Sequence, residues 1–106
     1  MKFILKIILS LLTLSILASQ AHAKNKYILV AHGLASDSFW NAARNGMDNA
    51  CEMVDADCSY RGNEVFSVDA MVKLMEQAIA ENPDGIGITL PDAAGLAEVV
   101  RKAVAT

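Results

Sequence analysis

Aromatic and charged residues lie at the ends of three segments of this sequence that are predicted to be strands. The first segment is followed by Asp37, Phe39 and Trp40, the second is closed by Arg61, and the third is followed by Asp92. A sugar packs its C–H face on an aromatic ring, and its hydroxyl groups need paired hydrogen-bond donors and acceptors. Gathered at one edge of a sheet, these residue types predict a site for a small sugar-like solute.

Each of these residues also has a simpler structural interpretation. Phe39 fits the apolar stripe of the helix that follows it, so core packing and ligand contact are both open for it, whereas Trp40 is one position off that stripe and is better placed for a ligand. Asp37 and Asp92 suit the N-cap positions of two helices. Arg61 on its own is typical of a solvated surface charge.

The composition argues against several other classes of function. The formal net charge is −3 and the basic residues are not clustered, so we expect no nucleic-acid partner. His32 is the only histidine after residue 23, which argues against a histidine-rich metal site. No set of residues for catalysis is present, and we expect a protein that binds its ligand without a covalent step, without a metal and without a cofactor.

The elements that would position these residues alternate between strand and helix. Short apolar runs bounded by turn residues predict strands buried on both faces, and apolar residues at helical spacing predict the helices between them. Alternation of this kind predicts an α/β fold with βαβαβα topology, a three-stranded parallel sheet in the order 2-1-3 and right-handed crossovers. We expect strands at about residues 27–31, 56–61 and 86–90, and helices over about residues 38–54, from an N-cap at Ser67 to the turn at Pro83, and from an N-cap at Asp92 to about Val104.

Residues 1–23 have the composition of a secretory signal peptide. Lys2 and Lys6 mark a basic start, residues 7–18 are mostly apolar, and Ala21 and Ala23 have the spacing that signal peptidase accepts. The apolar run is short for a membrane-spanning helix. We therefore expect cleavage after Ala23, leaving residues 24–106 as one small domain outside the cytoplasm.

The two cysteines are expected to pair. Export leads to an oxidising compartment, where disulfides persist. Cys51 lies on the helix face predicted to turn toward the sheet, and Cys58 lies in the next strand, so their Cβ atoms can come within bridging distance. The alternative is a pair of small, buried apolar residues.

In the order and spacing of its motifs, the chain resembles the N-terminal part of a periplasmic sugar-binding protein of the ribose- and galactose-binding type, the solute receptors of carbohydrate ABC transporters. The resemblance covers essentially all of residues 24–106 and implies a periplasmic protein whose sugar is held between two lobes and which acts with a transporter permease. The resemblance implies that Asp37, Phe39 and Trp40 supply the first-lobe contacts to the sugar. It also implies contacts from Arg61 and Asp92, whose positions vary in their contacts across the family. Ser38 stands where relatives often have proline. The matching motifs are His32-Gly33, Asp37-Ser38-Phe39-Trp40, Tyr60-Arg61, Asn82-Pro83-Asp84-Gly85 and Pro91-Asp92-Ala93.

The same resemblance implies that these residues form about half of one binding lobe. The family's fourth strand, its hinge and its second lobe have no counterpart in the sequence, so we expect a truncated product whose sugar binding is no better than millimolar. The third strand would then have one unpaired edge, without a charged residue to protect it, and we expect self-association there.

Two other interpretations remain open. Residues 30–33 followed by Trp40 also resemble the oxyanion-loop region of α/β-hydrolases, but the chain has no G-x-S-x-G elbow and no histidine after His32. An intact hydrolase is therefore excluded, and a fragment of a hydrolase remains as an alternative. The other interpretation is a small periplasmic interaction domain that uses its sheet edge. DNA just downstream that encodes the missing lobe, in any frame, would identify a broken transporter receptor.

Overall fold

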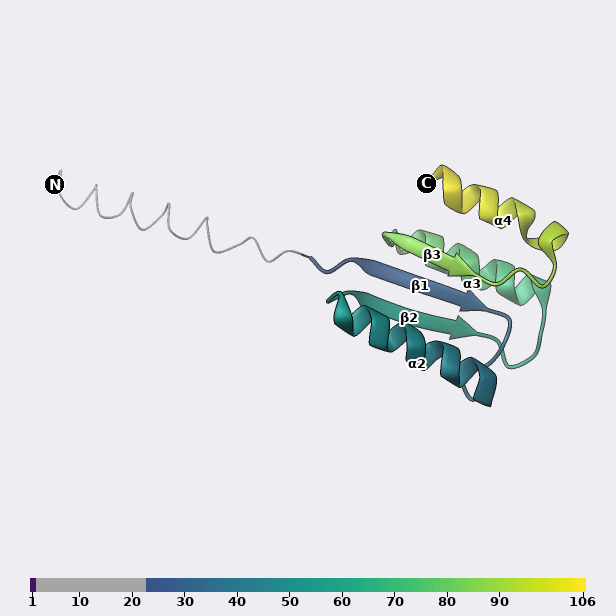
Figure 1. Ribbon diagram of the computed structural model, residues 1–106. Helices are drawn as coiled ribbons and strands as arrows, with labels where there is room; N and C mark the ends of the chain where they lie inside the picture. Colours follow the sequence, from purple (N-terminus) through teal and green to yellow (C-terminus); the bar gives the residue numbers. More distant parts are fainter. Residues whose placement is uncertain (2–22) are drawn as a thin grey trace.

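The computed structural model describes Met1 and residues 23–106, which form one layered α/β unit (Figure 1). The predicted signal peptide lies outside the described residues except for its two end positions. Within the described part of the chain, no helix has both the length and the apolar character needed to cross a membrane.

Three parallel strands form the sheet in the order β2-β1-β3, which confirms the predicted topology. Strand β1 spans Lys26–Ala31, β2 spans Asp57–Gly62 and β3 spans Gly85–Ile88. In the register, Tyr27 of β1 lies opposite Cys58 on one side and Gly85 on the other. Strand β3 ends two residues earlier than predicted, because at Thr89 the chain turns and its hydroxyl bonds to the end of β1.

Each of the three helices begins at a side-chain cap that the sequence indicated. Helix α2 spans Ser38–Met53, α3 spans Val68–Ala80 and α4 spans Ala93–Ala105. The preceding residues Asp37, Ser67 and Asp92 accept hydrogen bonds from backbone N–H groups in the first turns, at 2.9, 3.3 and 3.0 Å. These bonds satisfy donors that a helix start would otherwise leave unpaired.

The core lies on one face of the sheet, where β1 meets α3 and α4. Ile28 and Val30 point to this face because alternate strand residues share a side. They pack against α3 and α4 (Figure 1). The buried members of this core are Ile28, Val30, Met71, Met75, Ala78, Leu96 and Val99.

Helix α2 lies on the other face, against β2, and contributes no fully buried residue. Its half-buried residues include Trp40, Met47 and Cys51, which recur at helical spacing. Phe39 is 69% exposed, so core packing, one of the two roles left open for it, is excluded. The expectation that Trp40 lies off the inner stripe was wrong, because Trp40 is half-buried. The sequence contained two overlapping apolar stripes, and contacts with the sheet selected the one that begins at Trp40.

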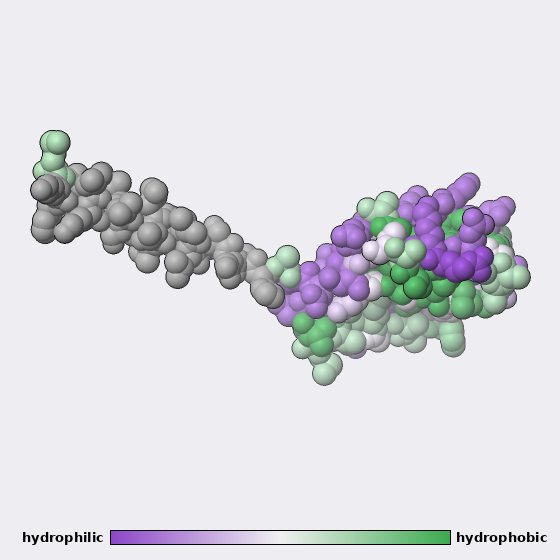
Figure 2. All heavy atoms as spheres, turned by 90° about the horizontal axis from the view of Figure 1, so that it is seen from above, coloured by the Kyte–Doolittle hydropathy of each residue, from purple (hydrophilic) through white to green (hydrophobic). Residues whose placement is uncertain are grey.

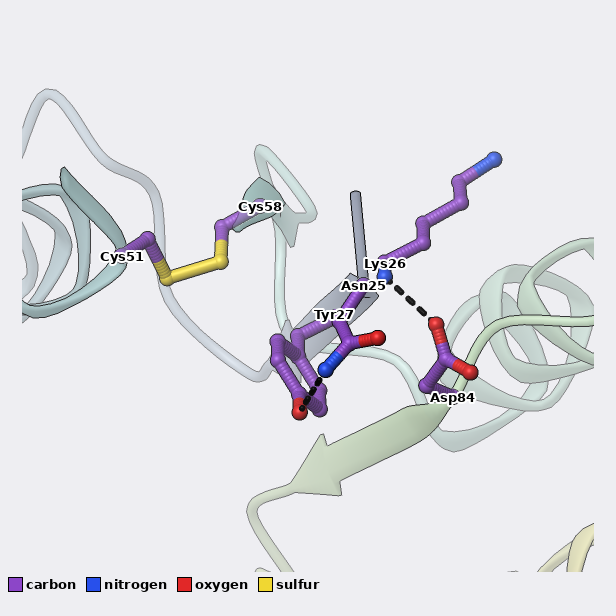
Figure 3. The surroundings of a disulfide bond; sticks show 6 residues. All are labelled: Asn25, Lys26, Tyr27, Cys51, Cys58 and Asp84. Carbon is purple, nitrogen blue, oxygen red and sulfur yellow. Dashed lines mark hydrogen bonds between the residues drawn. A yellow bond between two sulfur atoms is a disulfide. The ribbon is translucent and has the colours of Figure 1, made fainter. Parts of the chain in front are cut away.

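A disulfide joins α2 to the sheet (Figure 3). It links Cys51, near the end of α2, to Cys58 in β2, with their Cα atoms 6.3 Å apart. Close by, the backbone N–H of Lys26 donates to Asp84 Oδ2 at 2.7 Å, which ties the start of β1 to the turn before β3 (Figure 3). The amino ends of the strands are thus fixed by one covalent and one charge-assisted contact.

Candidate functional site

The carboxyl ends of β1 and β3 are held together by one side chain. Thr89, directly after β3, places its Oγ1 3.1 Å from the backbone nitrogen of His32, which donates to it, and 2.8 Å from His32 Nδ1. The backbone N–H of Thr89 in turn donates to the carbonyl of Val30 at 3.1 Å. His32 therefore has a fixed backbone and a fixed ring position at this edge of the sheet.

The loop after β1 is also bound to β2. The Tyr60 hydroxyl donates to the carbonyl of Gly33 at 2.7 Å. A Cβ atom at Gly62 would overlap the same carbonyl oxygen, so β2 can approach the loop this closely only with glycine at its end. Burial of the Tyr60 ring, and to a smaller extent the negative charge of Asp37, raise the pKa of Tyr60. The phenol therefore stays protonated and keeps its bond to Gly33 in neutral solution.

Four aromatic side chains gather at this edge, and we call them the aromatic cluster: His32, Phe39, Trp40 and Phe66. The His32 and Trp40 rings meet edge to face with centroids 4.8 Å apart, and Phe39 meets Trp40 in the same way at 5.0 Å. Phe66, from the loop before α3, stands 6.1 Å from His32. Phe39 and Phe66 are 69% and 53% exposed, so the cluster offers apolar ring surface to solvent.

The structure brings three of the sequence-predicted residues together here. Asp37, Phe39 and Trp40 share the loop and first turn at the start of α2. Asp37 uses Oδ1 to cap the helix, which leaves its second carboxylate oxygen open. Asp92 caps α4 in the same way after β3, at the same edge of the sheet.

Arg61 is directed elsewhere. Its Nη2 lies 2.6 Å from Glu81 Oε1, and Lys26 Nζ lies 2.6 Å from the other oxygen of Glu81. Glu81 follows α3 near the amino end of β1, so the Arg61 guanidinium extends away from the aromatic cluster. Hydrogen bonds from Lys26 and then from Arg61 lower the pKa of Glu81.

Sequence reasoning missed two members of the aromatic cluster and the side chain that fixes one of them. His32 had been named as part of a family motif and weighed as a metal ligand, but not as a ligand contact. Thr89 had been placed at the end of the third strand without a role, and Phe66 had not been considered. Position directly after a strand was an available signal for His32 and Thr89. Phe66 had no such signal, because its approach to His32 depends on where the crossover from β2 to α3 passes.

Phe39 and Phe66 expose their rings at the aromatic cluster, and a hollow of about 380 Å³ lies at the opposite end of the strands. That hollow is lined by the turn before β3 and by the end of α4, including Asp84, Gly85 and Val104. Among residues 23–106 there is no group of His, Cys, Asp and Glu side chains that could hold a metal ion.

A parallel, doubly wound sheet with aromatic and carboxylate groups at its carboxyl edge defines a solute-binding α/β domain, since ligands bind outside the carboxyl ends of such strands. The family model described as a periplasmic binding protein domain matches residues 28–106, and the chain belongs to this family. A comparison with curated proteins finds no match.

Solved structures similar to this chain include sugar-binding proteins of ABC transporters. A periplasmic sugar-binding protein from Legionella pneumophila has a TM-score of 0.73 and 26% identity, over 77% of this chain and 30% of its own. An arabinose-binding protein from Geobacillus stearothermophilus has a TM-score of 0.71 and 29% identity, over 78% of this chain and 28% of its own. A sugar-binding protein from Bacillus halodurans has a TM-score of 0.71 and 27% identity, over 77% of this chain and 28% of its own. The chain therefore spans less than a third of each neighbour.

Proposed function

We propose that this chain forms one face of the ligand site in a sugar receptor that serves a carbohydrate ABC importer. The observation that carries the proposal is the packing of Trp40 with His32 and Phe39 at the carboxyl ends of the strands. A sugar binds to aromatic rings that lie near free hydrogen-bond acceptors, and here the second carboxylate oxygen of Asp37 is such an acceptor. The role is binding alone, so we propose a receptor and not an enzyme.

In the proposed complex, the C–H face of the sugar lies on Trp40 and Phe39. The free carboxylate oxygens of Asp37 and Asp92 accept hydrogen bonds from ligand hydroxyl groups, while their other oxygens keep the helix caps. A contact from Arg61 would require its guanidinium to leave Glu81. We therefore propose that Arg61 contributes least to sugar binding among the five candidate residues.

The proposal includes the cellular setting implied by the family. Residues 1–23 direct export and are removed, and residues 24–106 act in the periplasm with a transporter permease. N-terminal sequencing of the exported protein tests the first step. A mature chain that begins at Lys24 supports it, and retention of residues 1–23 contradicts it.

The indole N–H signal of Trp40 gives a direct test of ligand binding, because the sequence has one tryptophan. One neighbour is described as an arabinose-binding protein, so arabinose is the first ligand to titrate, followed by other pentoses and by hexoses. We expect the indole signal to shift with at least one sugar, and the shift to be lost in Phe39→Ala. Met53→Ala is the matched control, because Met53 is an exposed apolar residue at the far end of α2. An indole signal that no sugar moves would contradict the proposed function.

We also propose that the free edge of β3 pairs with the β3 edge of a second copy. Among the strands within residues 23–106, β3 pairs with β1 alone, and Gly85–Ile88 carries no charge along that edge. The side on which α4 lies shows apolar surface between hydrophilic groups (Figure 2), and the 380 Å³ hollow adjoins β3 there. Unpaired strand edges beside apolar surface favour association. A protein that stays monomeric would instead favour the small interaction domain.

A further inference from the structure

We propose that His32 is a ligand-contact residue, and that Thr89 selects the tautomer of its neutral ring that carries the proton on Nε2. This inference rests on the proposed function, since it names a further hydrogen-bond donor in that site. The ligand group it would take is an uncharged oxygen acceptor, such as a sugar hydroxyl or ring oxygen.

The tautomer follows from the bonding capacity of one hydroxyl group. A threonine hydroxyl has one proton to donate and two lone pairs to accept with. Thr89 Oγ1 already accepts from the backbone N–H of His32 at 3.1 Å, and it lies 2.8 Å from His32 Nδ1. If Nδ1 carried the proton, Oγ1 would accept twice and its own O–H would need another acceptor.

Among the residues that the structure describes, Thr89 Oγ1 makes hydrogen bonds to His32 alone. The arrangement that satisfies every group has the Thr89 O–H donating to an unprotonated Nδ1. The proton of the neutral ring is then on Nε2, since the hydrogen bond at one imidazole nitrogen decides which nitrogen is protonated.

The position of the ring makes Nε2–H available to a ligand. His32 is half-buried and stands edge to face with Trp40 and with Phe66, within the aromatic cluster. Over residues 23–106, Nε2 has no hydrogen-bond partner. It thus adds a donor to the edge of the sheet that also carries the carboxylate acceptor of Asp37, and a site with both a donor and an acceptor matches a ligand that carries hydroxyl groups.

Long-range proton–nitrogen correlation of the exported protein tests the tautomer without any ligand. The signals of His32 are assigned by their loss in His32→Gln. We expect Nε2 to have the shift of a protonated nitrogen and Nδ1 that of an acceptor, in a single tautomer. Thr89→Ser keeps the hydroxyl and should keep this pattern, whereas Thr89→Val has the same shape without the donor and should give a mixture of tautomers. A proton on Nδ1 in the unmodified protein would overturn the inference.

Titration with sugar then tests the contact. Shifts of both the Trp40 indole and His32 Nε2 support the inference together with the proposed function. A shift of Trp40 without His32 overturns the inference while the function stands. If neither signal moves, both are overturned, and the tautomer measurement still reports whether Thr89 controls the ring. Because Thr89→Ser and the unmodified protein already decide the tautomer, the result does not depend on the folding of Thr89→Val.

Discussion

The indole of Trp40 lies directly over Gly33, so closely that a Cβ atom at position 33 would overlap the ring. The loop after β1 and the start of α2 can meet in this way only because residue 33 has no side chain. This contact places the tryptophan in the aromatic cluster and selects the side of α2 that faces the sheet.

Gly33→Ala should therefore displace Trp40. We expect a loss of about 1–3 kcal/mol in the free energy of unfolding, as for other overpacked sites, and a red shift of the tryptophan emission as the ring becomes more exposed. Gly46→Ala is the matched control, because a Cβ at Gly46 on exposed α2 meets nothing within 4 Å. It should stabilise the helix by about 0.5–1 kcal/mol. Equal effects of the two substitutions would contradict the contact.

The disulfide should be present in the exported protein and should stabilise it. Cys51 and Cys58 are 7 positions apart in sequence, and closing so short a loop is worth about 2–3 kcal/mol in the chain-entropy model. Replacing both cysteines by serine should lower the free energy of unfolding by that amount. Thiol titration of the unreduced protein is the direct check, and two free thiols would end the idea.

Sugar affinity should be no tighter than millimolar. A working site buries most of its ligand's surface, whereas the aromatic cluster is an open surface that covers one face of a sugar. Isothermal titration of residues 24–106 with common pentoses and hexoses measures the dissociation constant. A micromolar value for any of them would show that these residues already enclose the ligand.

Self-association should depend on β3. Ile88→Lys introduces a charge at this edge and should reduce association, but Ile88 packs against the core, so the substitution should also cost stability. Gly87→Lys separates the two effects, because Gly87 is exposed on the side of β3 that faces away from that core. Its Cβ would meet the Leu29 side chain at 3.1 Å, and the end of that flexible side chain can shift. Light scattering at about tens of micromolar gives the mass. A cooperative, folded monomer of the unmodified chain would refute the association.

Stability should fall on acidification as Glu81 loses its charge. Its ion pairs with Lys26 and Arg61 lower its pKa below the ordinary value of 4.5, so the unfolded chain takes up the proton first. The contribution of Glu81 is therefore present above the ordinary pKa and is lost as the pH falls through the lowered one. Glu81→Gln should flatten this part of the dependence of unfolding on pH, and Arg61→Ala should weaken it. An unchanged slope in Glu81→Gln would show that the ion pairs add nothing.

The amino-acid sequence by itself determined the topology and the start of every helix. Alternating strand and helix patterns allow few arrangements of a small parallel sheet, and the caps at Asp37, Ser67 and Asp92 are bonds between residues two or three positions apart. Such local relationships can be recognised in sequence because they do not depend on how the elements pack.

Only the tertiary structure decided which side chains share the carboxyl edge. Trp40 turned inward instead of Phe39 because Gly33 and the Cys51–Cys58 disulfide fix the rotation of α2. The Arg61 side chain extends away from the carboxyl edge because it forms an ion pair with Glu81, which is distant in sequence. Phe66 and Thr89 contact His32 because the loop before α3 and the end of β3 pass close to the end of β1. No periodicity in the sequence encodes that approach. The contacts of Arg61, Phe66 and Thr89 join residues far apart in sequence. Even the contacts of Gly33 and of the disulfide, which span few positions, gain their energy only once the loop, α2 and the sheet have packed.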